Sequence, residues 1–351
     1  MNLTARCPYC NSSLSVPEAM RARPTRINIR LGSPTSVGKT TKWIWLLVVV
    51  PLLGVGVIMA AVAILIPLMR RTDATNDRRS LKDQPPGFAT LVLNFGGEGI
   101  GPGMFKDARS IAVDASGKIY VGEYIGGRIQ VFGPDGKFLT QWTVDLKMPL
   151  RGLAADRKGK VYVVQAGKIT RYEGETGKLL GELDYAGGGG FDDLSMSADG
   201  GFVAAWYSNR DDIVRFNSAG EVTRILRAAI SSTSGDSELN TRVAIDGLGN
   251  IYALGTFNNA VFKFGPDGKF VTRFGDSGDQ NGQFHSPFAI AVDGKGRVYV
   301  SDIKGIQVFD GNGRYLKVFK PDGLAFGMVF NDNSELVMAV RNHVLKYSIS
   351  D

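Results

Sequence analysis

The sequence predicts an all-β fold, a six-bladed β-propeller, preceded by one transmembrane helix. The first observation is a short apolar phrase that ends in Asp and recurs six times, at Asp114, Asp156, Asp199, Asp246, Asp293 and Asp332. Successive Asp residues are 42, 43, 47, 47 and 39 positions apart, a period typical of propeller blades or a solenoid. Two further observations are a spare β-rich segment before the first repeat and a long uncharged stretch upstream of it.

Each repeat except the sixth carries four strand signals. In the first repeat they lie at residues 110–113, 119–121, 128–132 and 137–142, and the sequence Gly-Pro-Asp-Gly at 133–136 predicts a turn between the last two. Four short antiparallel strands are what a propeller blade needs. We expect the recurring Asp to cap the turn after the first strand by accepting backbone N–H groups, so we assign it to the scaffold.

The two ends of the repeat region predict that the ring is closed. The sixth repeat ends with its third strand at Val344–Tyr347, close to the C-terminus, and has no room for a fourth. The segment Thr90–Gly96 stands just before the first repeat and has strand character. If it completes the sixth blade, no edge remains between the first and last blades.

The loops and strands of the fifth repeat resemble the NHL repeat. Gly275–Phe284 leads through Pro287 to Ile290–Asp293 and then to two further strand signals, at 297–302 and 305–309. The segment from Phe95 to Asp114 repeats the same signature, and the resemblance covers roughly residues 89–351. It implies a six-bladed NHL propeller. Such propellers are mostly binding platforms, and a minority are lyases or hydrolases.

The expected ligand face is the rim that carries the second-to-third strand loops and the connections between blades. The candidate ligand-binding residues on this rim are Arg109, Glu123, Arg151, Gln165, Trp206, Arg242, His285, Asp302 and Arg341. Arg109, Arg151 and Arg242 precede first strands, so together they could bind a carboxylate or phosphate. The other interpretation is that they pair with Asp193, Glu123 and Asp302 and merely hold blades together.

Enzyme chemistry has weaker support in these residues. The NHL-type amidating lyases use a zinc ion held by several histidines, whereas this chain has only His285 and His343. Lactonase-like propellers hold a divalent cation with Glu, Asn and Asp, and Glu123, Asn209, Asn258 and Asp302 supply those types without a spacing that singles them out. We assign no catalytic residue. The expected function is a non-catalytic platform that binds a protein, peptide or small ligand, and the alternative is a metal-assisted lyase or lactone hydrolase in the channel.

The positive charge lies in the N-terminal tail. The chain has a formal charge of +7, and residues 1–42 contribute +6 through seven basic side chains and Glu18. Subtracting the tail leaves about +1 for the other 309 residues. Because a near-neutral domain has no broad attraction for phosphate backbones, no nucleic-acid partner is expected.

Residues 43–69 carry no charged side chain and predict a single transmembrane helix. Trp43 and Trp45 suit the membrane interface, and a polar stalk over residues 70–88 begins with Arg70 and Arg71. Five basic residues lie within twenty positions of each end, so charge alone does not orient the span. We expect a cytoplasmic N-terminus and an extracytoplasmic propeller over residues 89–351, in the cell membrane.

That orientation rests on Cys7 and Cys10, the only cysteines in the chain. A cysteine pair that is ready to bind a metal belongs in a reducing compartment such as the cytoplasm. Cys7-Pro8-Tyr9-Cys10 is similar to the first knuckle of a zinc ribbon, but residues 26–30 lack the second Cys pair. Two thiolates cannot complete a four-ligand zinc site within one chain. The pair is therefore a degenerate ribbon, a zinc site completed by a second chain, or a redox pair, and zinc is the one cofactor that it suggests.

Overall fold

The computed structural model describes residues 4–6, 13–15, 87–207 and 211–350. The chain divides into two compact units, Met1–Asp83 and Gln84–Asp351. In the first unit, β1 (Thr4–Arg6) pairs antiparallel with β2 (Ser13–Ser15). The span expected at residues 43–69 and the cysteine pair, Cys7 and Cys10, lie outside the described residues. Within the described ranges, no helix has the length and apolar character needed to cross a membrane.

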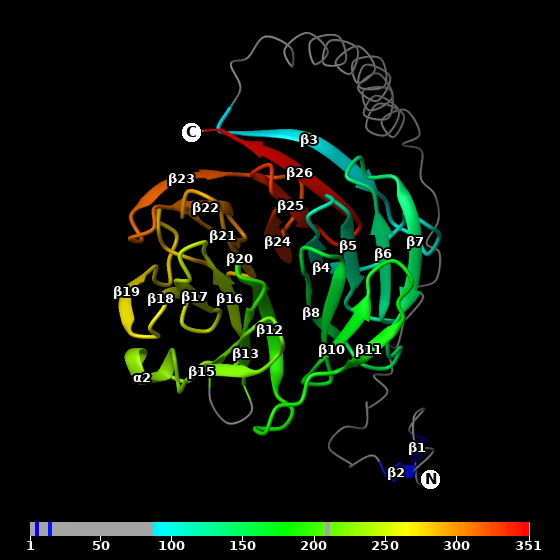
Figure 1. Ribbon diagram of the computed structural model, residues 1–351, viewed down its shortest axis with the longest axis horizontal. Helices are drawn as coiled ribbons and strands as arrows, with labels where there is room; N and C mark the ends of the chain where they lie inside the picture. Colours follow the sequence, from blue (N-terminus) through cyan, green and yellow to red (C-terminus); the bar gives the residue numbers. More distant parts are fainter. Residues whose placement is uncertain (1–3, 7–12, 16–86, 208–210, 351) are drawn as a thin grey trace, which may run out of the picture. The chain divides into compact units, whose positions relative to one another are not determined.

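The second unit is the predicted propeller. Residues 87–207 and 211–350 form six four-stranded antiparallel sheets arranged around a common centre (Figure 1). Blade 1 contains β4 (Ala108–Val113), β5 (Ile119–Glu123), β6 (Arg128–Phe132) and β7 (Phe138–Thr143). Blade 2 contains β8 (Leu150–Ala155), β9 (Lys160–Gln165), β10 (Lys168–Glu173) and β11 (Leu179–Glu182). Blade 3 contains β12 (Phe191–Met196), β13 (Phe202–Trp206), β14 (Asp212–Phe216) and β15 (Val222–Leu226).

The remaining three blades continue around the ring. A short helix, α2 (Ser231–Ser234), lies in the connection from blade 3 to blade 4. Blade 4 contains β16 (Thr241–Ile245), β17 (Ile251–Gly255), β18 (Ala260–Phe264) and β19 (Phe270–Phe274). Blade 5 contains β20 (Ala289–Val292), β21 (Val298–Asp302), β22 (Gly305–Phe309) and β23 (Tyr315–Phe319). Blade 6 contains β24 (Gly327–Phe330), β25 (Glu335–Ala339), β26 (His343–Ile349) and β3 (Ala89–Gly96).

The closure predicted from the two ends of the repeat region is confirmed. Strand β3 pairs antiparallel with β26, with Phe95 opposite Val344 and Leu93 opposite Lys346. The strand that precedes blade 1 in sequence is therefore the outer strand of blade 6. Pairing the two ends of the domain in one sheet leaves no open edge between the first and last blades.

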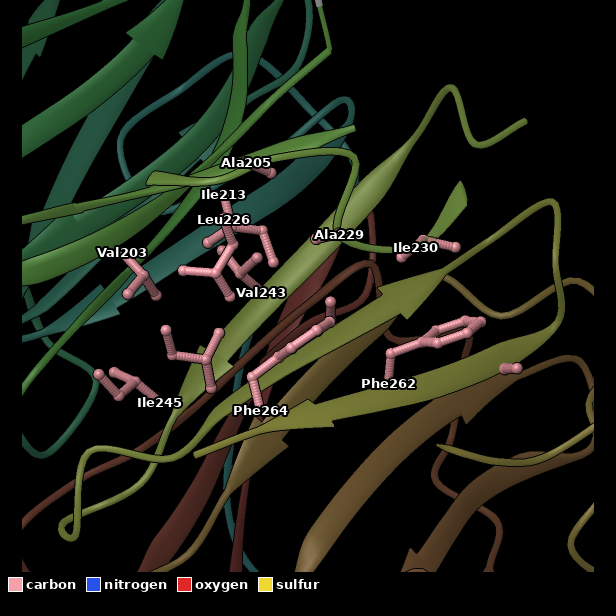
Figure 2. Close-up of a cluster of buried hydrophobic side chains, with 13 residues drawn as sticks. Val203, Ala205, Ile213, Leu226, Ala229, Ile230, Val243, Ile245, Phe262 and Phe264 are labelled. Atoms are coloured by element: carbon pink, nitrogen blue, oxygen red, sulfur yellow. The ribbon is translucent and has the colours of Figure 1, made fainter. Parts of the chain in front are cut away.

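The hydrophobic core lies between the blades. Each of six clusters of buried side chains joins two neighbouring blades, including blades 6 and 1. Figure 2 shows one of them, in which Val203 and Ile213 of blade 3 pack with Val243 and Phe262 of blade 4. Because the second strand of a blade is covered on both faces by neighbouring blades, β5, β17 and β21 are buried at every position.

The expected Asp caps are confirmed at four turns. After β4, Asp114 Oδ1 accepts hydrogen bonds from the backbone N–H groups of Ser116 (2.9 Å) and Lys118 (3.1 Å). The carboxylates at the equivalent turns of blades 2, 4 and 5 accept in the same way; they belong to Asp156, Asp246 and Asp293.

The assignment of one shared position to all six Asp residues is wrong for blades 3 and 6. The equivalent positions there hold Ser197 and Asn331, and the backbone N–H of each donates across the turn, to Gly201 and Glu335. Asp199 lies two residues after Ser197, and Asp332 lies one residue after Asn331, so both are inside the turn. Asn331 Oδ1 accepts the N–H groups of Asn333 and Glu335, so an amide oxygen replaces the carboxylate at this turn.

Candidate binding site at the channel mouth

The inner strands enclose a channel along the propeller axis. Its volume is about 350 Å3, and its wall is formed by β4, β8, β12, β16, β20 and β24. Each of these strands starts at the rim that carries the connections between blades. We call that end of the channel the channel mouth. Its lining includes Arg109, Arg151, Asp193, Arg242 and Phe326. The three predicted arginines are therefore brought together.

Bulges in three inner strands shape the mouth. The register with the second strand shifts between Ala108 and Ser110 in blade 1, between Leu150 and Gly152 in blade 2, and between Phe191 and Asp193 in blade 3. The extra residues are Arg109, Arg151 and Asp192. Because a bulge bends the strand and re-aims its side chain, charged residues reach the mouth from strands that are otherwise apolar.

Arg151 and Asp192 link blade 2 to blade 3. Arg151 Nε donates to Asp192 Oδ1, and the Asp192 side chain is completely buried. Asp192 Oδ2 has no hydrogen-bond partner among the described residues. A buried carboxylate of this kind is stabilised mainly by its one charged partner, so Arg151 serves the scaffold as well as the mouth.

Arg242 and Asp193 form a contact between blades 4 and 3 that is longer than the Arg151–Asp192 pair. Arg242 Nη1 lies 3.8 Å from Asp193 Oδ1 and donates to the Arg151 carbonyl at 3.3 Å. Asp193 Oδ2 accepts the Val243 N–H at 2.9 Å. Burial raises the pKa of Asp193 to about 6, although the Arg242 charge and the Val243 hydrogen bond act in the opposite direction.

Arg109 and Arg341 occupy the boundary between blades 1 and 6. Arg109 makes two contacts of 2.9 Å with the Asp107 carboxylate, one from Nε and one from Nη2. Its guanidinium lies over the rings of Tyr124 (4.3 Å) and Phe326 (5.2 Å). Arg341, from the β25–β26 loop, lies 5.1 Å from the same Phe326 ring. Two cations therefore share one aromatic side chain at the mouth.

The acids that pair with the arginines differ in part from those expected. Asp193 contacts Arg242 as predicted, whereas Arg109 and Arg151 pair with Asp107 and Asp192. Glu123 pairs instead with Arg128 at 2.7 Å, and Asp302 lies 3.9 Å from Lys304. The expectation that Glu123 and Asp302 pair with the mouth arginines is wrong, because each side chain turns back into the loop of its own blade.

Glu123 and Asp302 have equivalent structural roles in blades 1 and 5. Glu123 Oε1 accepts the Lys106 N–H at 2.6 Å, and Asp302 Oδ2 accepts the His285 N–H at 3.2 Å. Each carboxylate thereby anchors the loop that enters its blade. Both are buried, which leaves their oxygens to the protein rather than to a ligand.

The entry loops of blades 1 and 5 also share an internal hydrogen-bond pattern. Gln130 accepts the Gly103 N–H and donates to the Met104 carbonyl, both at 2.8 Å. Gln307 makes the same two contacts in blade 5, at 2.9 and 2.7 Å, with Gly282 and Gln283. Each loop closes with a parallel bridge to a buried phenylalanine, Phe105 or Phe284. The similar sequences of these loops therefore fold in the same way.

The other rim candidates lie away from the mouth lining. Gln165 fixes the connection from blade 1 to blade 2 through hydrogen bonds to Asp145 and Met148. Trp206 packs in the core between blades 2 and 3, and its Nε1 has no partner among the described residues. The exposed His285 ring lies 3.2 Å from Asp279.

Several mouth residues were missed at the level of sequence. Asp107 lies two residues before Arg109, and Asp192 directly precedes Asp193, so the local density of charge before inner strands could have indicated both. Tyr124 and Phe326 look like ordinary core aromatics in the sequence. Their position under the guanidinium groups depends on the ring bringing blades 1 and 6 together.

At the opposite end of the channel, an ion pair connects blade 2 with blade 6. Arg157 of blade 2 makes two hydrogen bonds, of 3.0 and 2.8 Å, to the carboxylate of Asp332 in blade 6. Both side chains are exposed, so solvent screens the pair and its contribution to stability is small. Within the described ranges, no group of three or more His, Cys, Asp or Glu side chains is placed to hold a metal ion.

Comparisons with known proteins show the fold. No protein-family model matches the sequence, and no curated protein matches it. Among solved structures, a gluconolactonase from Xanthomonas campestris is 17% identical, with a TM-score of 0.55 over 74% of this chain and 99% of the other. A protein of unknown function from Bacteroides thetaiotaomicron is 16% identical, with a TM-score of 0.55 over 75% and 76%. The WD40 propeller domain of Doa1 is 12% identical, with a TM-score of 0.51 over 75% and 98%. At these identities the likeness extends to the propeller fold alone.

Proposed function

We propose that this chain is an NHL-type propeller that binds a protein partner, without catalysis, on the face that contains the channel mouth. The matched entry loops of blades 1 and 5 support the NHL assignment. We further propose that residues 43–69 tether the propeller to the cell membrane, with the propeller on the extracytoplasmic side. The partner would then be a protein or peptide on that side of the membrane.

Exposed apolar side chains favour the face that contains the channel mouth. Among the described residues, eight exposed large hydrophobic side chains lie in loops of the mouth face: Ile100, Ile125, Leu146, Met148, Tyr207, Leu239, Phe257 and Ile303. Leu248 is the one such residue in the turns of the opposite face. The exposed apolar residues that remain belong to outer strands of the blades. Exposed apolar side chains that gather on one face are typical of an interaction surface.

The arginines at the centre of this face favour a partner with an acidic group surrounded by apolar residues. Arginine and aromatic side chains are enriched where protein interfaces bind most strongly, and loops on a rigid scaffold are common binding elements. Arg109 and Arg151 are each ion-paired and remain partly exposed at the mouth. These pairs orient the guanidinium groups before a partner arrives, which reduces the entropic cost of binding.

Photo-crosslinking in cells that produce the full chain tests this proposal. A benzoyl-phenylalanine replaces Phe257 or Ile125 on the mouth face, or Leu248 on the opposite face as the matched control. We expect both mouth-face positions to give an adduct of the same mass, and Leu248 to give none. An adduct of equal yield at Leu248, or none at either mouth-face position, would contradict the proposal.

A lactone hydrolase in the channel is the second candidate, because a gluconolactonase has the same fold. Residues such as Asp193, with a pKa of about 6, could take part in proton transfer. The test is hydrolysis of gluconolactone by the full chain, with divalent cations added. Activity that is lost in Asp193→Asn would favour the enzyme over the binding platform.

A further inference from the structure

Arg341 has an unusual backbone conformation. This residue has φ of +67°, in the left-handed region that long side chains rarely adopt. Its N–H and carbonyl exchange hydrogen bonds with Ala108, at 3.1 and 2.6 Å, and so fix this conformation at the boundary between blades 6 and 1. Strained residues of this kind gather at binding sites, where the strain sets the direction of a side chain.

The guanidinium of Arg341 has hydrogen-bond donors to spare. Its side chain is 61% exposed, and its nearest acidic atom is Asp107 Oδ1, 3.9 Å from Nε. That distance is too long for a hydrogen bond. Within the described residues its side chain makes no other polar contact, whereas Arg109 and Arg151 each donate to a carboxylate. Arg242 also lacks a hydrogen bond to a carboxylate, but its side chain is only 22% exposed and its Nη1 donates to the Arg151 carbonyl. Arg341 is therefore the most exposed of the four arginines at the mouth and the one most ready to bind an added anion.

The surroundings of Arg341 define the charge and shape of that anion. The Asp107 carboxylate is already occupied by Arg109, so Arg109, Arg341 and Asp107 together carry one excess positive charge. The ring of Phe326 lies beneath both guanidinium groups and packs against Phe288 at 5.2 Å. A monoanion matches this charge, and an attached aromatic or bulky apolar group matches the aromatic surface.

We propose that Arg341 and Arg109, with Phe326 and Phe288, form a subsite for a carboxylate joined to an aromatic or bulky apolar group. This inference rests on the proposed function, in which a partner protein supplies the carboxylate from its C-terminal residue, whose side chain is aromatic or bulky and apolar. The planar guanidinium of Arg341 pairs with the two carboxylate oxygens, and Arg109 contributes charge from beside the ring. A dianionic phosphate fits less well, because Asp107, Asp192 and Asp193 offset three of the four arginine charges at the mouth and leave one positive charge in excess.

Binding of small probes to the purified full chain tests the subsite directly. The probes are N-acetyl-phenylalanine, its neutral amide, and phenyl phosphate, each titrated by isothermal calorimetry. We expect the carboxylate to bind about tenfold more tightly than the amide, as one charge-assisted contact predicts. Equal affinity for the acid and the amide, or no measurable binding of the acid, would overturn the proposal. Tighter binding of phenyl phosphate would overturn the choice of carboxylate.

Three variants connect the probe to Arg341. Arg341→Gln should weaken binding of N-acetyl-phenylalanine about tenfold, and Arg341→Lys should weaken it less, since lysine keeps the charge without the planar fork. Arg314→Gln is the matched control, because Arg314 is an exposed arginine in a turn of the opposite face. An Arg341→Gln variant with wild-type affinity would sink the subsite.

The probe and the crosslinking experiment fail independently. If the subsite is wrong and the platform is right, the mouth-face adducts persist while N-acetyl-phenylalanine does not bind. If the platform is wrong, the adducts are absent whatever the probe does. A partner whose adduct at Phe257 disappears in Arg341→Gln but persists in Arg314→Gln would support both together.

Discussion

Ala108 and Arg341 exchange two backbone hydrogen bonds, of 2.6 and 3.1 Å, across the boundary between the first and last blades. They form a second connection at the ring closure, nearer to the channel than the pairing of β3 with β26. The first connection lies at the outside of blade 6, and the second lies at the channel mouth. The closure of the ring therefore also builds the proposed binding site.

Replacement of Arg341 should separate the backbone strain from the side-chain role. Glycine tolerates a φ of +67°, so Arg341→Gly should be about 1 kcal/mol more stable than Arg341→Ala, as judged by urea unfolding. The order at ordinary helix or strand positions is the reverse, because glycine loses more conformational entropy on folding. An alanine variant as stable as the glycine variant would show that the backbone at this position relaxes.

Phe95 should contribute to ring closure through its packing as well as its strand pairing. Its ring lies 4.7 Å from that of Phe132 in blade 1, although Phe95 belongs to the outer strand of blade 6. Phe95→Ala should lower the free energy of unfolding by about 2 kcal/mol, since the ring is partly buried. Val92→Ala on the same strand is the control; Val92 is exposed, so its removal should cost under about 0.5 kcal/mol. Equal losses would mean that strand pairing alone closes the ring.

The architecture was predictable from the sequence because blade repeats have a simple physical signature. Strands with alternating apolar residues and Pro-Asp-Gly turns depend on local chemistry, which a single sequence displays. Their recurrence at a spacing of 39 to 47 residues then indicates the blades. The strand Thr90–Gly96 was identifiable because the last repeat lacked a partner for Val344–Tyr347. The pairing of Phe95 with Val344 then follows from the need to cover an edge.

The site was less predictable because it depends on register. Arg109 and Arg151 were selected from their positions before inner strands, but the bulges that turn them into the mouth have no clear sequence signal. Their acidic partners, Asp107 and Asp192, were missed because pairing depends on distances between blades. Asp199 was misassigned because β12 ends at Met196, so that Ser197 occupies the position of Asp114 and Asp199 lies inside the turn.

The turn after β20 provides a test of the cap. Asp293 accepts the N–H groups of Lys295 and Arg297, a hydrogen bond from Arg297 Nε and one from the Tyr299 hydroxyl, at 2.7 to 3.0 Å. Asp293→Ala should cost about 3 kcal/mol, because buried donors lose their acceptor. The turn of blade 6 uses Asn331 with Glu335 instead, whose Oε2 accepts the Asn331 amide at 2.7 Å.

That natural pair suggests a rescue. Asp293→Asn alone should be intermediate in stability, and Asp293→Asn combined with Arg297→Glu should recover about 1 kcal/mol by reproducing the Asn331–Glu335 contact. The measurement is a double-mutant cycle of urea unfolding. If the double variant is no more stable than the sum of the two single changes, the contact is not transferable between blades.

Asp193 should make the stability of the propeller depend on pH. Burial raises its pKa in the folded protein to about 6 from an ordinary value of 3.8, so the folded state binds more protons than the unfolded state between these values. Stability from this group is therefore greatest at low pH and falls as pH rises through the window from about 4 to 6. The difference between these two pKa values corresponds to about 3 kcal/mol at pH 7. Asp193→Asn does not titrate, so its stability relative to the wild type should rise by about that amount between pH 4 and pH 7.

The control for this titration is Asp199→Asn. Hydrogen bonding from the Gly201 N–H lowers the pKa of Asp199, so its contribution is present above pH 4 and changes little up to pH 7. Urea unfolding of the three proteins at several pH values measures both differences. A constant difference between Asp193→Asn and the wild type over this range would mean that water reaches Asp193 freely. The Arg242 contact would then be a surface ion pair, and the Asp193 carboxylate would titrate near its ordinary pKa of 3.8.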